Sequence, residues 1–311
     1  MKLGILMSGQ GAQTVGMGRD LYDNVPAYRD TIDRASKVLG YDLMTTVCED
    51  ETKIGQTQYA QAAIFAMSMG IYNALADVLP KPAGFLGLSL GEYSALAAAG
   101  VLDFEQAVAI LKDRGQYMQT VGAANPGKMV AVMSDDQALV ETVLTDLQAQ
   151  GKQVYPANFN TFAQLVMGGI EADVDAAVAK LTEAGVTRMI DLPVSGAFHT
   201  PLLAEAATQL QTRLADEAVQ EPSAPVYSNT TAQPFADVIA TLGQQIIKPT
   251  YFAQALQGMM ETGVDTLIEF GPSNTLIKFS KKIAAKDVVR YNVADLASYQ
   301  ATREDLTAVT E

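Results

Sequence analysis

Residues 84–99 read GFLGLSLGEYSALAAA and contain the pattern that decides the fold. A short apolar run leads into Gly87-Leu88-Ser89-Leu90-Gly91, and an alanine-rich segment follows directly. This order predicts a buried strand, a tight turn and a helix. In a G-x-S-x-G turn the serine occupies strained backbone at the tip, and side chains two positions away would collide. The serine hydroxyl then lies beside the helix N–H groups, which can stabilise a developing oxyanion.

A serine hydroxyl is a weak nucleophile and needs a base. The chain of 311 residues has a single histidine, His199, so an imidazole base for Ser89 must be His199. It lies in Pro193–Pro201, at a predicted strand-to-helix junction, where loops commonly carry function. Two alternatives remain at this point: Ser89 as a simple helix cap, and His199 as an incidental polar residue.

The remaining segments predict two domains in an α/β fold. Residues 126–195 have the order β-α-β-β-α-β, which is typical of a ferredoxin-like (split βαβ) domain. Its strands are expected at 129–133, 153–158, 165–167 and 188–192, and its helices at 136–150 and 174–184. Residues 1–125 and 196–311 are expected to form a larger α/β domain around it, with strands at 3–7, 84–87, near 226 and at 266–270, and helices at 28–39, 61–79, 92–99 and 202–218.

Composition excludes several classes of protein. With 21 Lys and Arg against 35 Asp and Glu, the net charge is −14, which disfavours binding to nucleic acid or an anionic membrane. No apolar run reaches the ~18 residues that a membrane span needs, and no signal peptide is evident. The one cysteine, Cys48, allows no internal disulfide and is expected to be a small buried residue. We therefore expect a cytoplasmic protein that does not bind membranes.

Three further features have both a structural and a functional interpretation. The turn Gly9-Gln10-Gly11-Ala12-Gln13 lacks the P-loop and dinucleotide patterns, but its N–H groups could form the second half of an oxyanion hole. Arg114 is expected late in a helix that starts near Asp103, where a solvated cation is favoured. A solvated face or a patch for an acidic partner would explain four lysines at helical spacing: Lys278, Lys281, Lys282 and Lys286.

Five motifs in this order resemble the malonyl-CoA:acyl-carrier-protein transacylase family, the loading enzymes of bacterial fatty-acid synthesis. They are G-Q-G-A-Q, G-L-S-L-G-E-Y-S-A-L, D-R-G, G-A-F-H-T and E-F-G-P, and they extend from Gly9 to about Leu276. The resemblance implies a hydrolase-like parallel-sheet core with a ferredoxin-like insert, which agrees with the order of segments above. It implies no metal or other cofactor, and the chain has no Cys/His cluster that could hold a metal.

The resemblance also implies roles for particular residues. Ser89 would be the acylated nucleophile, His199 its base, and Arg114 a bidentate clamp on the malonyl carboxylate. Main-chain groups are implied for three more residues: the N–H groups of Gln10 and Leu90 in the oxyanion hole, and the carbonyl of Gln245 beside the histidine. The implied reaction moves malonyl from malonyl-CoA to the phosphopantetheine thiol of acyl carrier protein, an acidic partner for the lysines above. Phe198, as in malonyl-selective members, would leave little room for an α-branched acyl group.

Two positions depart from the family pattern. Leu88 stands where a histidine is common, and Ser8 stands where the first loop usually has proline. Three alternatives remain open: a serine hydrolase with Asp191 as the third acid, a carrier-protein-binding scaffold without activity, and a transacylase that serves polyketide synthesis or malonate decarboxylation. A hydrolase usually places its histidine near the C-terminus, whereas 112 residues (311 − 199) follow His199.

Overall fold

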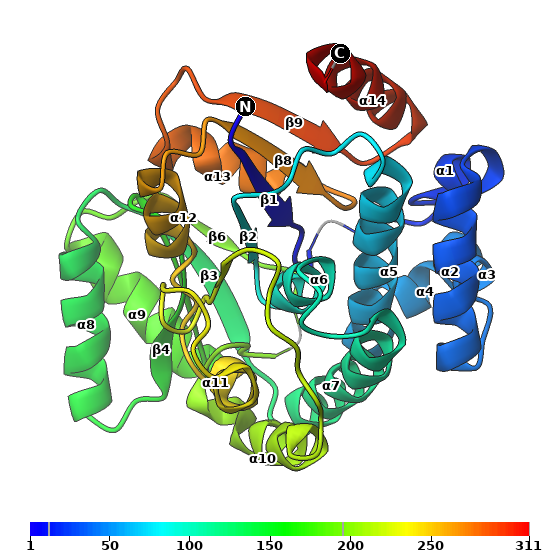
Figure 1. Cartoon of the computed structure of the whole chain (residues 1–311). Helices are drawn as coiled ribbons and strands as arrows, with labels where there is room; N and C mark the ends of the chain where they lie inside the picture. Colours follow the sequence, from blue (N-terminus) through cyan, green and yellow to red (C-terminus); the bar gives the residue numbers. More distant parts are fainter. Residues whose placement is uncertain (12, 195, 311) are drawn as a thin grey trace.

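The computed structural model describes residues 1–11, 13–194 and 196–310, and it contains two β-sheets (Figure 1). The side chain of Cys48, which the sequence predicts to be buried, lies outside the described residues, as does Ser195 at the predicted domain boundary. The larger sheet is central in the molecule, and the smaller one lies to one side of it.

The larger sheet has five parallel strands in the order β7-β2-β1-β8-β9. The strands are β1 (Leu3–Met7), β2 (Gly84–Gly87), β7 (Val226–Tyr227), β8 (Thr266–Phe270) and β9 (Val289–Val293). Alternate residues of β1 face opposite sides, with Ile5 in one hydrophobic core and Leu6 in the other. This burial on both faces explains the nearly continuous apolar runs in the sequence.

Helices cover both faces of this sheet, as in Figure 1. Two of them pack on the face of Leu6: α12 (Phe252–Glu261) and α13 (Thr275–Ile283). The larger core on the face of Ile5 includes residues from α1 (Arg19–Asn24), α2 (Pro26–Leu39), α3 (Leu43–Glu49), α4 (Glu51–Ile54), α5 (Thr57–Leu75), α6 (Gly91–Ala98), α7 (Phe104–Ala124), η1 (Pro201–Leu203), α10 (Ala204–Leu214), α11 (Val238–Gln245) and α14 (Leu296–Thr310).

The smaller sheet is antiparallel, in the order β4-β5-β3-β6. Its elements follow the predicted β-α-β-β-α-β sequence: β3 (Lys128–Met133), α8 (Gln137–Ala149), β4 (Val154–Thr161), β5 (Gln164–Gly169), α9 (Glu171–Glu183) and β6 (Met189–Asp191). Its two helices bury one face of the sheet. The other face packs with Phe198, beside His199. The predicted fold class is confirmed, and the exact domain limits stay a prediction.

Several element bounds differ from the sequence prediction. Strand β4 continues to Thr161, so the hairpin to β5 is a tight turn and Asn160 lies on the strand. The helix predicted to end at Leu79 ends at Leu75, before the two prolines. The helix predicted over 202–218 is a 3-10 turn followed by α10. Helix α13 ends at Ile283, so Lys286 lies beyond it and only three of the four lysines share the helix.

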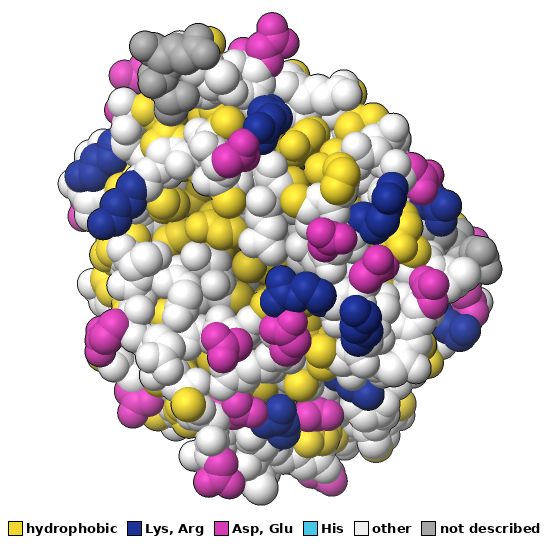
Figure 2. All heavy atoms as spheres, turned by 45° about the vertical axis from the view of Figure 1, so that its right-hand side comes forward, with side chains coloured by type: hydrophobic (Ala, Val, Ile, Leu, Met, Phe, Trp, Pro, Cys, Tyr) yellow, Lys and Arg dark blue, Asp and Glu magenta, His cyan; other side chains and the backbone are white. Residues whose placement is uncertain are grey.

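The surface on the side of α2 and α14 carries charges of both signs. Figure 2 shows basic and acidic side chains interspersed there, so the described residues of this face form no continuous basic patch of the kind that binds nucleic acid. Within the described chain, no helix combines the length and the apolar composition that crossing a bilayer requires.

Candidate active site

Ser89 lies in the turn between β2 and α6, with a left-handed backbone (φ 54°). Two close approaches make glycine necessary on either side of it. A Cβ at Gly87 would lie 1.9 Å from the carbonyl carbon of Gly91, and a Cβ at Gly91 would lie 2.3 Å from the carbonyl oxygen of Met7. The strand, the turn and the helix therefore meet as the motif predicts, and the serine is held at the tip.

Asn229 holds this strained turn from the loop after β7. Its side-chain oxygen accepts a hydrogen bond from the Ser89 N–H at 2.7 Å, and its side-chain nitrogen donates to the Gly87 carbonyl at 2.8 Å. Asn229 is fully buried. A buried amide with both ends bonded to the backbone stabilises a conformation that a serine rarely adopts. Local sequence patterns do not indicate Asn229, because it lies 140 positions from Ser89.

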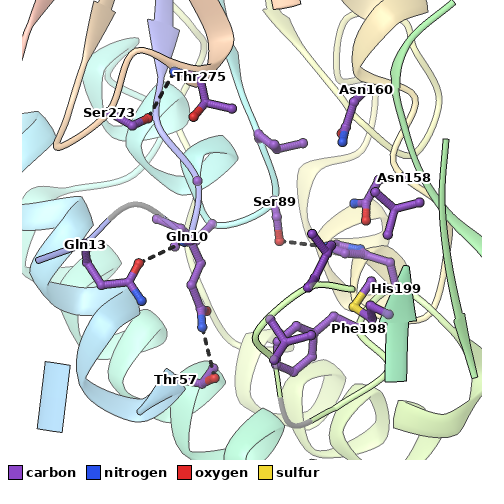
Figure 3. A pocket seen from close by; sticks show the side chains of 18 of the residues that line it. Gln10, Gln13, Thr57, Ser89, Asn158, Asn160, Phe198, His199, Ser273 and Thr275 are labelled. Carbon is purple, nitrogen blue, oxygen red and sulfur yellow. Dashed lines mark hydrogen bonds between the residues drawn. The ribbon is translucent and has the colours of Figure 1, made fainter. Parts of the chain in front are cut away.

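His199 reaches the nucleophile from the loop before η1. Its Nε2 lies 2.8 Å from Ser89 Oγ (Figure 3). Its Nδ1 lies 3.0 Å from the Gln245 carbonyl oxygen and 3.2 Å from that of Lys248. Carbonyl oxygens only accept hydrogen bonds, so Nδ1 carries the hydrogen. The lone pair on Nε2 is then free to accept from the Ser89 hydroxyl.

The surroundings of His199 keep its imidazole neutral. Burial and the charge of Arg114 lower the pKa of His199 from 6.5 to about 4, and the hydrogen bonds to the Gln245 and Lys248 carbonyls oppose this shift. At neutral pH the ring is therefore neutral, with its one proton on Nδ1, and its Nε2 is available as a base. Asp191, the alternative acid of a hydrolase triad, is exposed and forms an ion pair with Lys128 at 3.0 Å. The described partners of Nδ1 are carbonyl groups.

Arg114 is fully buried in the middle of α7, so its interpretation as a solvated cation near a helix end is wrong. Its Nη2 donates to Ser89 Oγ at 3.1 Å and to the Gln245 side-chain oxygen at 2.8 Å, and its Nη1 donates to Gln61. Its guanidinium also lies 5.4 Å from the Tyr93 ring centroid. Among the described residues no carboxylate forms an ion pair with it. A buried cation of this kind beside a serine favours an anionic ligand.

The two proposed oxyanion donors lie on elements that meet at Ser89. Gln10 follows β1, and its side chain donates to Thr57 at 3.1 Å (Figure 3). Leu90 is the N-cap residue of α6. In the described part of the chain, neither the Gln10 N–H nor the Leu90 N–H donates to a protein acceptor. Both groups are therefore available to a ligand, and their role in an oxyanion hole stays a prediction.

A pocket of about 640 Å³ between the two sheets is lined by Gln10, Ser89, Leu90, Arg114 and His199. Figure 3 shows Gln10 and Thr57 on one side of Ser89, and Asn158 and Asn160 of β4 on the other. Neither asparagine is a predicted site residue: Asn158 is the last residue of the predicted strand, and Asn160 lies beyond its end. Their spacing of two residues, which places side chains on one face of a strand, was the available signal.

Helix α13 connects this pocket to the lysines. Its residues Leu276 and Phe279 line the pocket, and Lys278, Lys281 and Lys282 are exposed on the same helix. Lys286, also exposed, follows three residues after the helix ends. No carboxylate of the described residues pairs with these four lysines. They are therefore free to meet a charged partner beside the pocket.

Comparison with known proteins identifies the family of the chain. The model of the acyl transferase domain family matches residues 5–307. A malonyl CoA-acyl carrier protein transacylase of Staphylococcus aureus is 33% identical over 308 residues, which cover 98% of this chain and 99% of the relative.

Two solved structures have nearly the same fold over 98% of this chain and all of theirs. One, from Streptococcus pneumoniae, has a TM-score of 0.94 at 43% identity. The other, a malonyl-transacylase in complex with a type II polyketide synthase acyl-carrier protein, has a TM-score of 0.93 at 31% identity. The chain therefore belongs to the acyl transferase family, within its group of malonyl-CoA–acyl carrier protein transacylases.

Proposed function

We propose that this acyltransferase moves malonyl from malonyl-CoA to the phosphopantetheine thiol of acyl carrier protein in fatty-acid biosynthesis, through a malonyl ester on Ser89. One observation carries the proposal: Ser89 Oγ is hydrogen-bonded both to the His199 imidazole and to the buried Arg114 guanidinium. A nucleophile with its base suits acyl transfer in general, and the cation at the same atom suits an acyl group that ends in a carboxylate.

In the first half-reaction, Ser89 Oγ attacks the thioester carbonyl and its proton passes to His199 Nε2. The carbonyl oxygen takes up negative charge, which the N–H groups of Gln10 and Leu90 stabilise. The C–S bond then breaks, and the proton on His199 passes to the sulfur of coenzyme A. The Nδ1–H bonds to the Gln245 and Lys248 carbonyls hold the ring in the orientation that both proton transfers need.

Arg114 makes the site selective for malonyl. When Ser89 is acylated, its oxygen becomes an ester oxygen and a poorer acceptor for Arg114 Nη2. The malonyl carboxylate is a far better one, and a guanidinium can hold it through two charge-assisted hydrogen bonds. Acetyl offers no such partner. Losing one member of a buried charged pair costs on the order of 2–5 kcal/mol, which sets the scale of this preference.

In the second half-reaction, the thiol of the carrier protein's phosphopantetheine arm attacks the malonyl ester, and His199 Nε2 accepts its proton. The ester C–O bond then breaks, and that proton passes from His199 to Ser89 Oγ, which restores the free hydroxyl. The arm contains amide groups, and the β4 wall of the pocket offers amides to meet them. The side-chain oxygen of Asn160 is buried without a hydrogen-bond partner among the described residues, and Asn158 lies two positions away. Hydrogen bonds to such groups would orient the arm toward Ser89.

The carrier protein is expected to approach over α13. Lys278, Lys281 and Lys282 are exposed on this helix, with Lys286 just beyond it, in a chain with a net charge of −14. A local basic surface beside the pocket attracts an acidic carrier, and it acts on the association rate more than on affinity.

The fate of the acyl-enzyme tests the proposal. The protein is loaded with malonyl-CoA, freed of excess donor and mixed with holo carrier protein, and the masses of both chains are followed. We expect the enzyme to lose one malonyl group as the carrier gains it, with slow loss to water alone. Release of the group as free malonate at the same rate with and without carrier would instead identify a hydrolase.

A further inference from the structure

Glu92 is a buried carboxylate directly behind the nucleophile, and the two half-reactions above do not use it. It lies in the first turn of α6, three residues after Ser89, and is 0% exposed. A buried carboxylate is costly unless its oxygens are hydrogen-bonded. Its partners therefore indicate what it stabilises.

Each oxygen of Glu92 accepts a hydrogen bond from a residue that holds the active site. Oε1 accepts from the Asn229 N–H, and Oε2 accepts from the Gln245 side-chain nitrogen. Asn229 in turn holds the strained Ser89 backbone. The carbonyl oxygen of Gln245 accepts from His199 Nδ1 at 3.0 Å. In this hydrogen-bond network, Asn229 thus links Glu92 to the nucleophile, and Gln245 links Glu92 to the base.

The side-chain amide of Gln245 can satisfy its neighbours in one orientation only. Its nitrogen donates to Glu92 and to the Ser89 carbonyl at 2.9 Å, and its oxygen accepts from Arg114 at 2.8 Å. A carboxylate and a carbonyl only accept, and a guanidinium only donates. A rotated amide would place donor against donor at Arg114 and acceptor against acceptor at Glu92.

We propose that Glu92 is a positioning residue of acyl transfer, which fixes the amide of Gln245 and the main chain of Asn229 and through them aligns His199, Arg114 and Ser89. The inference rests on the function proposed above. It gives this site a carboxylate that acts at one remove, where a Ser-His-Asp site has one directly on the imidazole.

Burial and the hydrogen bonds to Glu92 act on its charge in opposite directions. Burial raises the pKa of Glu92 to about 7, while hydrogen bonds from Asn229 and Gln245 and the charge of Arg114 oppose the rise. The Gln245 amide thus lies between the Glu92 carboxylate and the Arg114 cation, which has no ion pair among the described residues. Removing the negative charge leaves a buried cation without compensation.

Two substitutions of Glu92 separate positioning from packing. Glu92→Gln keeps the volume, but either orientation of the new amide sets one donor against another, at Asn229 or at Gln245. Glu92→Asp keeps the charge and both acceptors, and it loses one methylene from a buried site. If the carboxylate aligns the site, the Gln variant is the poorer enzyme. If Glu92 only fills space, the Asp variant is.

The test measures kcat and KM for malonyl transfer in the full chain, with Glu171→Gln as control, because Glu171 is an exposed glutamate in the first turn of α9. We expect Glu92→Gln to lower kcat about 10- to 100-fold, and Glu92→Asp to lower it less. A Gln variant as active as the parent, or more active than the Asp variant, would overturn the proposal.

The single histidine gives a readout that does not depend on activity. The imidazole ¹⁵N signals of the chain come from His199 alone. In folded Glu92→Gln we expect the Nδ1–H signal to shift, and an unchanged spectrum would contradict the proposal. Should that variant not fold, Gln245→Met removes the amide and keeps the main-chain carbonyl, with the same expected loss in kcat. A parent chain that never forms a malonyl adduct would refute the proposed function and leave this spectrum as the test of Glu92.

Discussion

The floor and the rim of the pocket differ in how their charged groups are surrounded: those on the floor are buried and hydrogen-bonded, and those on the rim are exposed. We define the pocket floor as Ser89, Arg114 and His199, which line the pocket, together with Gln245, which is hydrogen-bonded to Arg114 and His199. Hydrogen bonds of 2.8–3.1 Å join these residues, and all of them except Ser89 are buried. The lysine rim, defined by Lys278, Lys281, Lys282 and Lys286, is exposed and makes no ion pair among the described residues. Water and salt screen charges on the rim and leave those on the floor at nearly full strength.

This difference indicates where each part of the function resides. On the floor, a lost partner leaves a buried polar group unsatisfied, so single substitutions have large and specific effects. On the rim, each charge contributes little by itself and acts together with its neighbours. We therefore expect larger effects from substitutions on the floor than from substitutions on the rim.

The largest effect is expected from the nucleophile and its base. Ser89→Ala and His199→Ala should each lower malonyl transfer by at least about 10³-fold, and the double variant should be little worse than either, because the two residues act as one unit. Steady-state transfer to the carrier protein measures this. Ser94→Ala is a matched control, since Ser94 is a buried serine of α6, the helix that follows Ser89, and its hydroxyl has no described partner. Additive losses in the double variant would refute the shared role.

Arg114 should show the next largest effect, and only for a carboxylated acyl group. Arg114→Ala is expected to lower kcat/KM for malonyl-CoA by an amount equivalent to about 2–5 kcal/mol, and to change kcat/KM for acetyl-CoA little. Arg114→Lys should recover part of the loss, because it keeps the charge without the planar fork. Competition between the two thioesters measures the preference. If the variant loaded malonyl as well as the parent does, and acetyl as well as the parent does, the clamp would be excluded.

The pH dependence of His199 reports the burial of the floor. Burial and Arg114 both disfavour the imidazolium, which lowers its pKa to about 4. The ring should therefore stay neutral down to about pH 5, as an NMR titration of the single histidine can show. The unfolded imidazole takes up its proton near pH 6.5, so this group lowers stability as the pH falls from about 6.5 to about 4. A midpoint near 6.5 in the folded chain would contradict a buried base.

The smallest effect is expected on the rim. Lys281→Glu with Lys282→Glu should lower kcat/KM for the carrier protein by about tenfold or less, more at low salt, and leave transfer to free pantetheine unchanged. Lys37→Glu is the control, since it is exposed on α2, which provides none of the described lining residues of the pocket. Carrier kinetics that do not respond to charge reversal or salt would remove α13 from the docking surface.

The sequence predicted what local patterns encode. The elbow at Ser89, the split βαβ order and the dependence on the only histidine follow from residues close together in the chain or from a count. The fixed orientation of the Gln245 amide does not, because Glu92 and Gln245 are 153 positions apart. The neighbours of Arg114 in the chain indicate a solvated cation, and only the family resemblance implies a clamp, because the burial of its side chain comes from other elements that pack on α7. The spacing of Lys286 predicts that it shares a helix with the other three lysines, but α13 ends at Ile283.

The two departures from the family pattern also have a structural context. The Ser8 hydroxyl donates to the buried carboxylate of Glu269 at 2.8 Å, so a polar residue is satisfied where the first loop usually has proline. Leu88 lines the pocket and packs against the core on the α12 and α13 side of the sheet. Neither position interrupts the contacts among Ser89, His199 and Arg114.

The most direct test of the floor is to locate the acyl group. The chain is exposed briefly to malonyl-CoA, quenched in acid, digested and fragmented by mass spectrometry, with Ser89→Ala treated alongside. The account predicts one malonyl group, carried by the hydroxyl of residue 89 and missing from the alanine variant. A malonyl group on another side chain, or an equal yield from the variant, would contradict it.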